Sequence, residues 1–489
     1  MTPQCKTKLL LWVSRGVLAV LVLALLLIHP LCYCPGYYMA LSVAGIIPVV
    51  CGPRLYRWLG SAYIVGAMLL GVVEHRAGVG MSWWVGGARC AGKTVSGQPA
   101  YASALQTEIE SVMKANVIPG AIVLIKSRDK GDWQATLGTG EIGKTTPLFM
   151  ADFVRIGSNT KTMTSTVILQ LVQEGKLKLD DPISKFRPDV PNGRNITIEQ
   201  LATMRSGLYS YTFDLGFNET LDKDPKKAWT PDELLKIAFS HPSSAPPGTK
   251  FDYCNTNFVL LGLVIEQITG MSARDAFQKR IFEPLKLTHT QLPAANDWSI
   301  SDPHPQGYQF LSNVATINSY AVPPAQLPAA LNGTLRPLNQ TNANPSWAWT
   351  AGGGISTADD LAVYVKALVG GGLLNPQMQK IRLDSIVSTN PGNPAAAGYG
   401  IGIARFGPLT GHDGQIPGYS TVMVYDPKAD NMVIILTNLA AVPATGEGSA
   451  LVILKVVIPA LYGSAAGVPG GDPAAVPGTT RSPNSNRLF

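Results

Sequence analysis

The sequence predicts an α/β domain built on an antiparallel sheet, with transmembrane helices ahead of it. Strand patterns stand at both ends of the domain, and helical patterns with long Pro- and Asn-rich connections fill its middle. This order implies one sheet assembled from the N- and C-terminal parts and flanked by helices, with a mainly α-helical subdomain inserted between them. The transmembrane prediction comes from apolar runs in residues 1–75.

Three nearly uncharged apolar runs make up this membrane segment, at residues 9–33, 37–51 and 58–73. The first is long enough to span a bilayer, and the other two need flanking residues to reach about 20. No small-residue cleavage site closes the first run, so we expect about three transmembrane helices rather than a removed signal peptide.

Basic residues around these runs predict the orientation of the chain. Lys6, Lys8 and Arg15 precede the first span, and Arg54 and Arg57 lie between the second and the third. Such residues mark cytoplasmic segments. We therefore expect a multi-pass cell-membrane protein of bacterial type, with its large domain on the extracytoplasmic side.

The net charge of +7 belongs entirely to the N-terminal part. Residues 1–100 hold eight of the 39 Lys and Arg and one of the 32 Asp and Glu, which leaves 31 of each sign in the remainder. The basic excess is thus a topology signal, and we expect no nucleic-acid partner.

Cysteine and histidine give no metal site. Only Cys90 and Cys254 lie beyond the membrane segment, so there is no disulfide framework, although a single bridge between them stays open. The six histidines are scattered without the spacing of metal ligands. We expect neither a metal nor a cofactor.

One segment imitates a nucleotide-binding loop. Residues 87–94 match G-x-x-x-x-G-K-T, which needs a helix that opens at its lysine. Gly97 and Pro99 would break that helix. We therefore interpret the segment as part of a juxtamembrane linker, 76–101, and keep nucleotide binding only as an alternative.

The large domain is predicted to run from 102 to 463. Its N-terminal sheet part, 102–155, contains a helix at 102–115 and strands at 121–125 and 133–137. Its helical part, 165–340, contains helices at 165–174, 197–205, 231–240, 256–269 and 272–281. Its C-terminal sheet part, 345–463, contains a helix at 357–369, strands at 398–406, 420–425 and 432–438, and a closing helix at 450–462. Residues 464–489, rich in Gly, Pro, Ala and Ser, are predicted to be disordered.

Three short motifs carry the chemistry of this domain. Ser158 and Lys161 form an S-x-x-K element, with both side chains on one helical face. Tyr253 and Asn255 form a Y-x-N element, and His412 begins an H-x-G element just before a strand pattern. A serine hydroxyl needs a neighbouring base to become a nucleophile, and a lysine is such a base only if its pKa falls below its usual ~10.4.

Together and in this order, the three motifs resemble those of the penicillin-recognising serine hydrolases, in the branch of class C β-lactamases, DD-carboxypeptidases and esterases. The resemblance covers about residues 104–463 and implies the β-lactamase-like fold. Further segments that carry it are 196–201 with 206–208, 260–262 with 281–285, 351–357 and 398–402.

The resemblance also implies the roles of individual residues. Ser158 would attack the substrate carbonyl and form an acyl-enzyme, and Lys161 and Tyr253 would share the base role. His412 would complete the catalytic set. Substrate-binding residues would be Asn255, which orients the substrate amide; Gln415, whose backbone N–H holds the oxyanion together with that of Ser158; and Gly414, which lets the strand edge approach.

The third motif departs from the family pattern. His412 replaces the lysine of K-T-G and is mostly neutral at neutral pH. Asp413 would then place a negative charge where the family binds a substrate carboxylate, if its side chain faces the site. We therefore expect a membrane-anchored, extracytoplasmic serine hydrolase that acts on a small-molecule or peptide ester or amide.

Two alternatives stay open. The protein is a DD-carboxypeptidase or β-lactamase that acts on cell-wall peptides or β-lactams, or it is a catalytically silent binding protein of the cell surface. The intact Ser158, Lys161, Tyr253 and Asn255 argue against the second alternative. The sequence does not give the oligomeric state.

Overall fold

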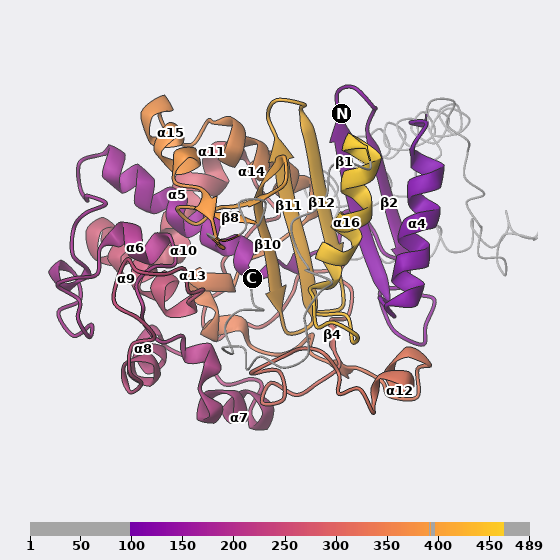
Figure 1. The fold of residues 1–489 in the computed structure, drawn as a ribbon, viewed down its shortest axis with the longest axis horizontal. Coiled ribbons are helices and arrows are strands. Elements are labelled where there is room, and N and C mark those ends of the chain that lie inside the picture. The colour runs from indigo at the N-terminus through magenta and orange to yellow at the C-terminus, as the bar shows by residue number, and fades with distance from the viewer. Residues whose placement is uncertain (1–97, 391, 393–396, 464–489) are drawn as a thin grey trace, which may run out of the picture. The chain divides into compact units, whose positions relative to one another are not determined.

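The computed structural model describes residues 98–390, 392 and 397–463 of the chain (Figure 1). The predicted membrane segment 1–75, the linker up to residue 97, Cys90, the nucleotide-loop look-alike and the tail 464–489 lie outside the described residues. The boundaries assigned to these segments stay predictions.

Within the described part, no single helix is long and apolar enough to cross a membrane. One bent pair, Asn255–Thr269 with Ala273–Leu285, meets the criteria of length and composition. The first helix of this pair is lined with buried residues of the domain core.

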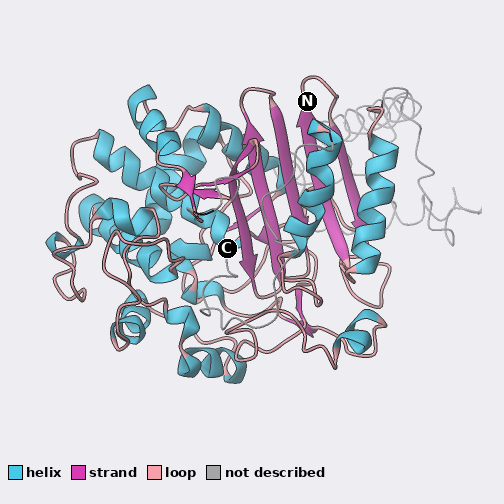
Figure 2. Cartoon of the chain, in the orientation of Figure 1, coloured by secondary structure: helices cyan, strands magenta, loops and turns pink. Residues whose placement is uncertain are grey.

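An eight-stranded antiparallel sheet forms the centre of the domain, in the order β2-β1-β12-β11-β10-β9-β8-β7 (Figure 2). N-terminal β1 pairs with C-terminal β12, with Ala121 opposite Thr437, which confirms that the two ends of the domain share one sheet. The strands are β1 (Gly120–Ser127), β2 (Trp133–Gly138), β7 (Val387–Ser388), β8 (Gly398–Tyr399), β9 (Ala404–Phe406), β10 (Leu409–Ile416), β11 (Tyr419–Asp426) and β12 (Asn431–Thr437).

Helices cover both faces of this sheet. Helices α4 (Ala102–Ala115) and α16 (Ser449–Tyr462) pack together on one face, and α14 (Ala358–Gly370) packs on the other (Figure 1). Strands β11 and β12 lie between these layers, so every residue of both strands is buried. This two-sided burial explains their nearly continuous apolar sequences.

A mainly helical part of the chain is inserted between β2 and β7. Most of its helices lie on the side of the sheet away from β2, whereas α12 lies at the lower right, on the side of β2 (Figure 1). Its helices are α5 (Thr160–Gln173), α6 (Ile198–Ala202), α7 (Leu215–Lys223), α8 (Pro231–Phe239), α9 (Asn255–Thr269), α10 (Ala273–Phe277), α11 (Glu283–Leu285), α12 (Leu327–Leu331), α13 (Trp349–Gly352) and α15 (Pro376–Asp384). The 3-10 turns are η1 (Gly157–Asn159), η2 (Ile183–Lys185), η3 (Tyr211–Phe213) and η5 (Pro345–Trp347), and η4 (Gln278–Phe282) is a π-turn. Two small sheets pair β3 (Val154–Arg155) with β6 (Ile355–Ser356), and β4 (Tyr308–Gln309) with β5 (Leu338–Asn339).

Capping residues fix where several of these helices begin. Thr197 and Gln200 form a capping box at α6, and Thr230 and Glu233 form another at α8. Each box satisfies backbone N–H groups that the first helical turn leaves without partners. The predicted helices at 197–205 and 231–240 are therefore real, although α6 is shorter than predicted.

Three local predictions differ from the structure. Helix α5 begins at Thr160 rather than at 165, because η1 leads directly into it. The predicted strand 398–406 is two strands, β8 and β9, separated by a turn in which Gly402 has a φ of +57°. His412 lies inside strand β10 rather than before the next strand.

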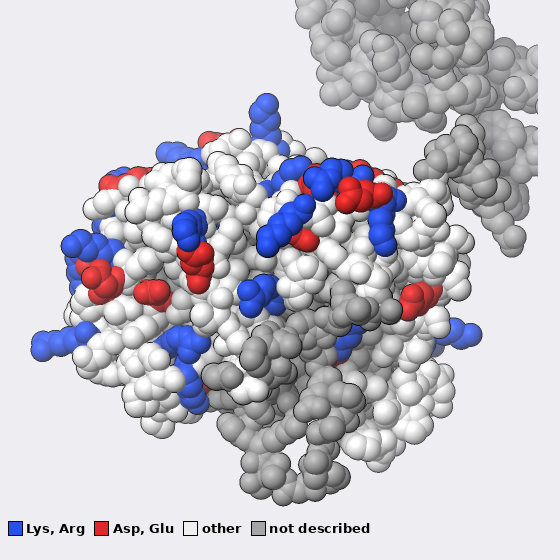
Figure 3. Space-filling view, turned by 45° about the horizontal axis from the view of Figure 1, so that its top comes forward, with Lys and Arg blue, Asp and Glu red and all other residues white. Residues whose placement is uncertain are grey.

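Charged side chains are interspersed over the face of the domain shown in Figure 3, with wide uncharged areas between them. Lys and Arg lie close to Asp and Glu on this face, which agrees with the balanced charge of the sequence beyond residue 100.

Candidate active site

Ser158 lies on η1, in the sharp turn between β3 and α5. Gly157 has a φ of +52°, a conformation that L-residues with a side chain rarely adopt. A Cβ atom on Gly157 would come within 2.8 Å of the backbone nitrogen of Gln415, and one on Gly414 would come within 2.0 Å of the Ile156 carbonyl oxygen. The two glycines thus allow the turn that carries Ser158 to touch β10.

Strand β10 is open toward this turn because its pairing with β9 ends at Gly411. Thr421 of neighbouring β11 helps to hold the turn there. Its hydroxyl donates to the Ile156 carbonyl oxygen (2.9 Å) and accepts from Asn159 Nδ2 (2.7 Å). The structure therefore brings the turn that carries Ser158 against Gly414 and Gln415.

Lys161 follows Ser158 by one helical turn and is completely buried. Its Nζ atom lies 3.0 Å from Ser158 Oγ, 2.8 Å from Asn255 Oδ1 and 2.6 Å from the Ala351 carbonyl oxygen. Burial lowers the pKa of Lys161 to about 7, although attraction by Asp413 and Cys254 opposes the shift. A substantial fraction of Lys161 is therefore a neutral amine at neutral pH.

The Ala351 carbonyl is a part of the site that sequence reasoning missed. It belongs to α13, where Trp349 has a φ of +31°, a strained value for a residue with a side chain. A backbone acceptor cannot be recognised from the residue type. The sequence feature beside it that could have indicated an unusual backbone is the glycine-rich run 352–354.

Tyr253 lies beside the lysine, with Lys161 Nζ 4.8 Å from the centroid of its ring. Burial raises the pKa of Tyr253 well above its usual value of 10, and a hydrogen bond with Ser158 only partly opposes this. The phenol therefore stays protonated. Of the two residues expected to share the base role, the environment favours Lys161 as proton acceptor.

Asn255 is the first residue of α9 and is held from two sides. Its backbone N–H donates to Ser210 Oγ (3.1 Å), and its Nδ2 atom lies 3.4 Å from Thr212 Oγ1. Its Oδ1 accepts from Lys161, so Asn255 helps to position the candidate base. Neither Ser210 nor Thr212 stood out in the sequence.

His412 is fully buried in β10. Its Nδ1 atom lies 2.5 Å from the Asp413 carbonyl oxygen. Because a carbonyl oxygen only accepts, Nδ1 carries the proton, and Nε2 accepts from the Tyr399 hydroxyl at 3.3 Å. Burial and the charge of Lys161 lower the pKa of His412 to about 3, so the imidazole is neutral. Its catalytic role stays a prediction.

Asp413, which follows His412 in β10, is also buried. Its side chain is buried, with a relative exposure of 3% for the residue, and burial raises the pKa of the carboxyl group well above its usual value of 3.8. Burial therefore disfavours the ionised form of this carboxyl group, and attraction by Lys161 opposes the effect. The expectation that Asp413 repels a substrate carboxylate stays a prediction.

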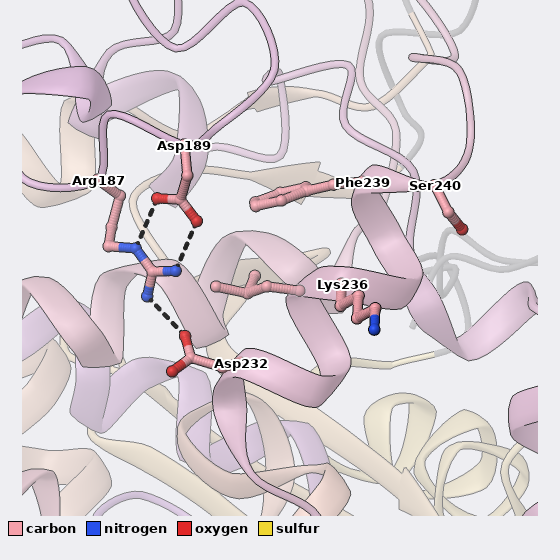
Figure 4. Close-up of a pocket in the computed structure, with 7 residues that line it drawn as sticks. Arg187, Asp189, Asp232, Lys236, Phe239 and Ser240 are labelled. Atoms are coloured by element: carbon pink, nitrogen blue, oxygen red, sulfur yellow. Dashed lines mark hydrogen bonds and ion pairs between the residues drawn. The ribbon is translucent and has the colours of Figure 1, made fainter.

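A separate surface hollow of about 610 Å³ lies along α8 (Figure 4). Arg187 donates from Nε and Nη2 to Asp189 (2.8 and 2.7 Å), and its Nη1 pairs with Asp232 at 3.1 Å. The remaining lining residues are Leu235, Lys236, Phe239 and Ser240. None of the predicted site residues lines this hollow.

Cys254, between the two residues of the second motif, is a buried free thiol. Its Sγ atom donates to the Leu208 carbonyl oxygen (3.3 Å), and burial raises its pKa to about 11. Among the residues that the structure describes, no group of three or more His, Cys, Asp or Glu is arranged to hold a metal ion.

Comparison with known proteins gives consistent matches. The family model described as Beta-lactamase matches residues 105–457. Protein flp of Staphylococcus aureus (strain MW2) is 26% identical over 348 residues, which are 68% of this chain and 62% of that protein. The chain thus spans less than two thirds of the length of this relative.

Two solved structures extend the comparison. A D-stereospecific amidohydrolase from Streptomyces sp. is 29% identical, with a TM-score of 0.60 over 73% of this chain and 99% of that chain. An octameric penicillin-binding protein homologue from Pyrococcus abyssi is 25% identical, with a TM-score of 0.58 over 73% of this chain and 76% of that chain.

Proposed function

The chain belongs to the beta-lactamase family and is a serine hydrolase of the penicillin-recognising type, and from this premise we propose that it cleaves an ester or amide through an acyl-enzyme on Ser158. The observation that carries the proposal is the contact of 3.0 Å between Lys161 Nζ and Ser158 Oγ in a fully buried setting. Such a contact supplies the base that a serine nucleophile needs.

In this mechanism the neutral form of Lys161 has a defined role for each of its three contacts. A neutral amine has two N–H bonds, which would donate to Asn255 Oδ1 and the Ala351 carbonyl oxygen. Its lone pair is then left to accept the Ser158 proton across the 3.0 Å contact. Ser158 Oγ attacks the substrate carbonyl while its proton moves to Lys161.

Breakdown of the tetrahedral intermediate releases the leaving group. The protonated Tyr253 hydroxyl gives its proton to the leaving atom and is reprotonated from Lys161, so the bond between carbon and leaving group breaks without releasing an unstable anion. Water then attacks the ester of Ser158 with Lys161 again as the base.

Backbone N–H groups of Ser158 and Gln415 would hold the developing oxyanion. The close approach of Gly157 to the Gln415 nitrogen supports this role. Each preorganised donor contributes about 3–4 kcal/mol of transition-state stabilisation in well-studied sites. The substrate carbonyl would therefore lie between η1 and the edge of β10.

The favoured substrates are esters and amides. An amide substrate is supported by the D-stereospecific amidohydrolase, the similar enzyme whose name states that activity. A second candidate, a DD-carboxypeptidase or β-lactamase, is supported by the similarity to the penicillin-binding protein homologue from Pyrococcus abyssi.

The test of the function is labelling with a fluorophosphonate and with a fluorescent penicillin. We expect Ser158→Ala to abolish labelling, while Ser103→Ala, on the exposed side of α4, leaves it unchanged. Labelling that persists in Ser158→Ala would refute the assignment of the nucleophile. Failure of every reagent on a folded protein would instead favour the catalytically silent binding protein.

The membrane location is a separate part of the proposal. We propose that residues 1–75 anchor the protein as a multi-pass segment and that the domain lies on the extracytoplasmic side, since the apolar runs and their basic flanks favour this topology. Reporter fusions after residue 101 test it: an alkaline phosphatase fusion should be active, and an active cytoplasmic reporter at the same point would contradict the orientation.

A further inference from the structure

Asp413 is a buried carboxyl group whose oxygen lacks a partner in the described part of the chain. Its Oδ1 atom is buried and accepts no hydrogen bond there. His412 Nδ1 lies 3.6 Å away, but its proton is directed at the Asp413 carbonyl oxygen at 2.5 Å. Nearly all buried polar groups in proteins are hydrogen-bonded. The unpartnered oxygen of Asp413 is therefore able to accept a group from outside the chain, and its position decides which group that is.

The position of Asp413 suggests that this partner is the substrate. The residue lies on β10 beyond Gly411, where pairing with β9 has ended, and directly before Gly414 and Gln415, which contact the turn of Ser158. Attraction between Asp413 and Lys161 also acts on the pKa of both groups, so the carboxyl group lies within electrostatic range of the base. A substrate that extends along this strand edge from Ser158 passes Asp413.

The charge states of the side chains around Ser158 indicate what kind of group would pair with Asp413. Lys161 must be neutral to accept the proton of Ser158, and His412 and Tyr253 are held neutral by burial. Among the side chains of the three motifs themselves, only the Asp413 carboxyl group is then left to take up a charge, and that charge is negative. Asp252, which precedes Tyr253, already accepts from Ser244 Oγ and pairs with Lys250. A buried carboxyl group ionises when a cation comes within contact distance.

We propose that Asp413 is a specificity-determining residue that pairs with an ammonium group of the substrate. The inference rests on the Ser158 acyl-enzyme proposed above and names its substrate class: esters or amides that carry a positive charge near the scissile bond. A substrate with a carboxylate at the same position leaves Asp413 without a partner and is disfavoured.

The chain offers a matched control for this residue. Asp152 is as deeply buried as Asp413, with a relative exposure of 2%, and its Oδ1 atom also lacks a partner among the described residues. Its Oδ2 atom accepts from the Phe149 N–H, and it precedes β3 outside the three motifs. Asp152→Asn therefore measures the general effect of neutralising a buried carboxyl group.

The experiment compares esters of matched size. They carry an ammonium group in the acyl part or in the leaving group, a carboxylate at the same positions, or no charge. The measured quantity is the ratio of kcat/KM for the cationic ester to kcat/KM for the neutral one, so each variant supplies its own reference. We expect one cationic position to be preferred by about tenfold to a hundredfold, as for a charge-assisted hydrogen bond. Asp413→Asn should reduce this ratio to near one, and Asp152→Asn should preserve it.

An unchanged ratio in Asp413→Asn, or a preference of the unmodified protein for the neutral or the carboxylate-bearing ester, overturns the inference. If Asp413→Asn does not fold, Asp413→Thr replaces it, and the order of ammonium, neutral and carboxylate esters in the unmodified protein decides independently. Failure of the proposed function looks different: no ester acylates Ser158, and the fluorophosphonate labels no variant.

Discussion

Two ionisable side chains on opposite sides of Ser158, Lys161 and Asp413, differ in how completely they are hydrogen-bonded. On the side of α5, Lys161 has three partners at 2.6–3.0 Å, all supplied by the chain. On the side of β10, Asp413 keeps a buried oxygen without one among the described residues. This contrast indicates that the base for acyl transfer is held in place before substrate binds. The Asp413 carboxyl group, in contrast, gains its partner only when substrate binds.

The largest expected effect tests the base that is held in place before substrate binds. Lys161→Met removes the base while keeping an unbranched apolar stem, so kcat/KM should fall by about 10²–10⁴-fold. Thermal stability should not fall in parallel, because the variant no longer buries an amine. Steady-state kinetics and melting curves measure the two quantities. Activity close to that of the unmodified protein would mean that Lys161 is not the base.

Tyr253→Phe separates proton acceptance from proton donation. An amide leaving group must be protonated, so its hydrolysis should fall by about 10²-fold when the phenol is removed. A p-nitrophenyl ester releases a stable anion and should lose much less. Equal losses for both substrates would contradict a role for Tyr253 in protonating the leaving group and would point to a role in serine activation.

The pH profile tests the charge state of Lys161. The amine must be neutral to accept a proton, and its pKa is lowered to about 7. Raising the pH removes the proton, so kcat/KM should increase with pH and level off above about 7, with a slope of about tenfold per pH unit on the acid side. A profile that is flat between pH 5 and pH 8, a range of about three units around that pKa, would contradict the assignment.

The smallest expected effect is a loss of stability, and it concerns the contact between the turn at Gly157 and strand β10. Gly157→Ala combines a positive φ with a Cβ atom 2.8 Å from the Gln415 nitrogen, so we expect a loss of about 1–3 kcal/mol in unfolding free energy. Gly175→Ala is the control, because Gly175 has a φ of +71° and open space around its Cβ position. Chemical denaturation of both variants isolates the cost of the contact. Equal losses would show that the close approach adds nothing.

Much of the sheet could be predicted from the sequence. Strands β1, β11 and β12 are rich in apolar residues because both of their faces are covered. Apolar residues in the sequence also predicted helices α4 and α16. Strand β10 was missed, since its sequence of Leu, Thr, Gly, His, Asp, Gly, Gln and Ile serves a site rather than a core. A strand that approaches a substrate needs glycines in place of β-branched residues.

The start of α5 was missed for a related reason. Residues 160–166 are mostly polar, yet all are buried, and their hydroxyl groups find acceptors such as the Thr350 carbonyl oxygen, which Thr164 Oγ1 contacts at 2.6 Å. A hydrophobic pattern does not register buried polar residues whose partners are backbone atoms far along the chain. The motifs could therefore locate Ser158, Lys161 and Tyr253, but not the Ala351 carbonyl that completes the surroundings of Lys161.

The most direct test of the central claim is mass spectrometry of the intact protein after exposure to a mixed panel of β-lactams and activated esters, followed by peptide mapping. We predict a covalent acyl adduct on Ser158 that is absent from Ser158→Ala and that forms slowly in Lys161→Met. An adduct on another residue, or none on a protein shown to be folded, would contradict the acyl-enzyme mechanism.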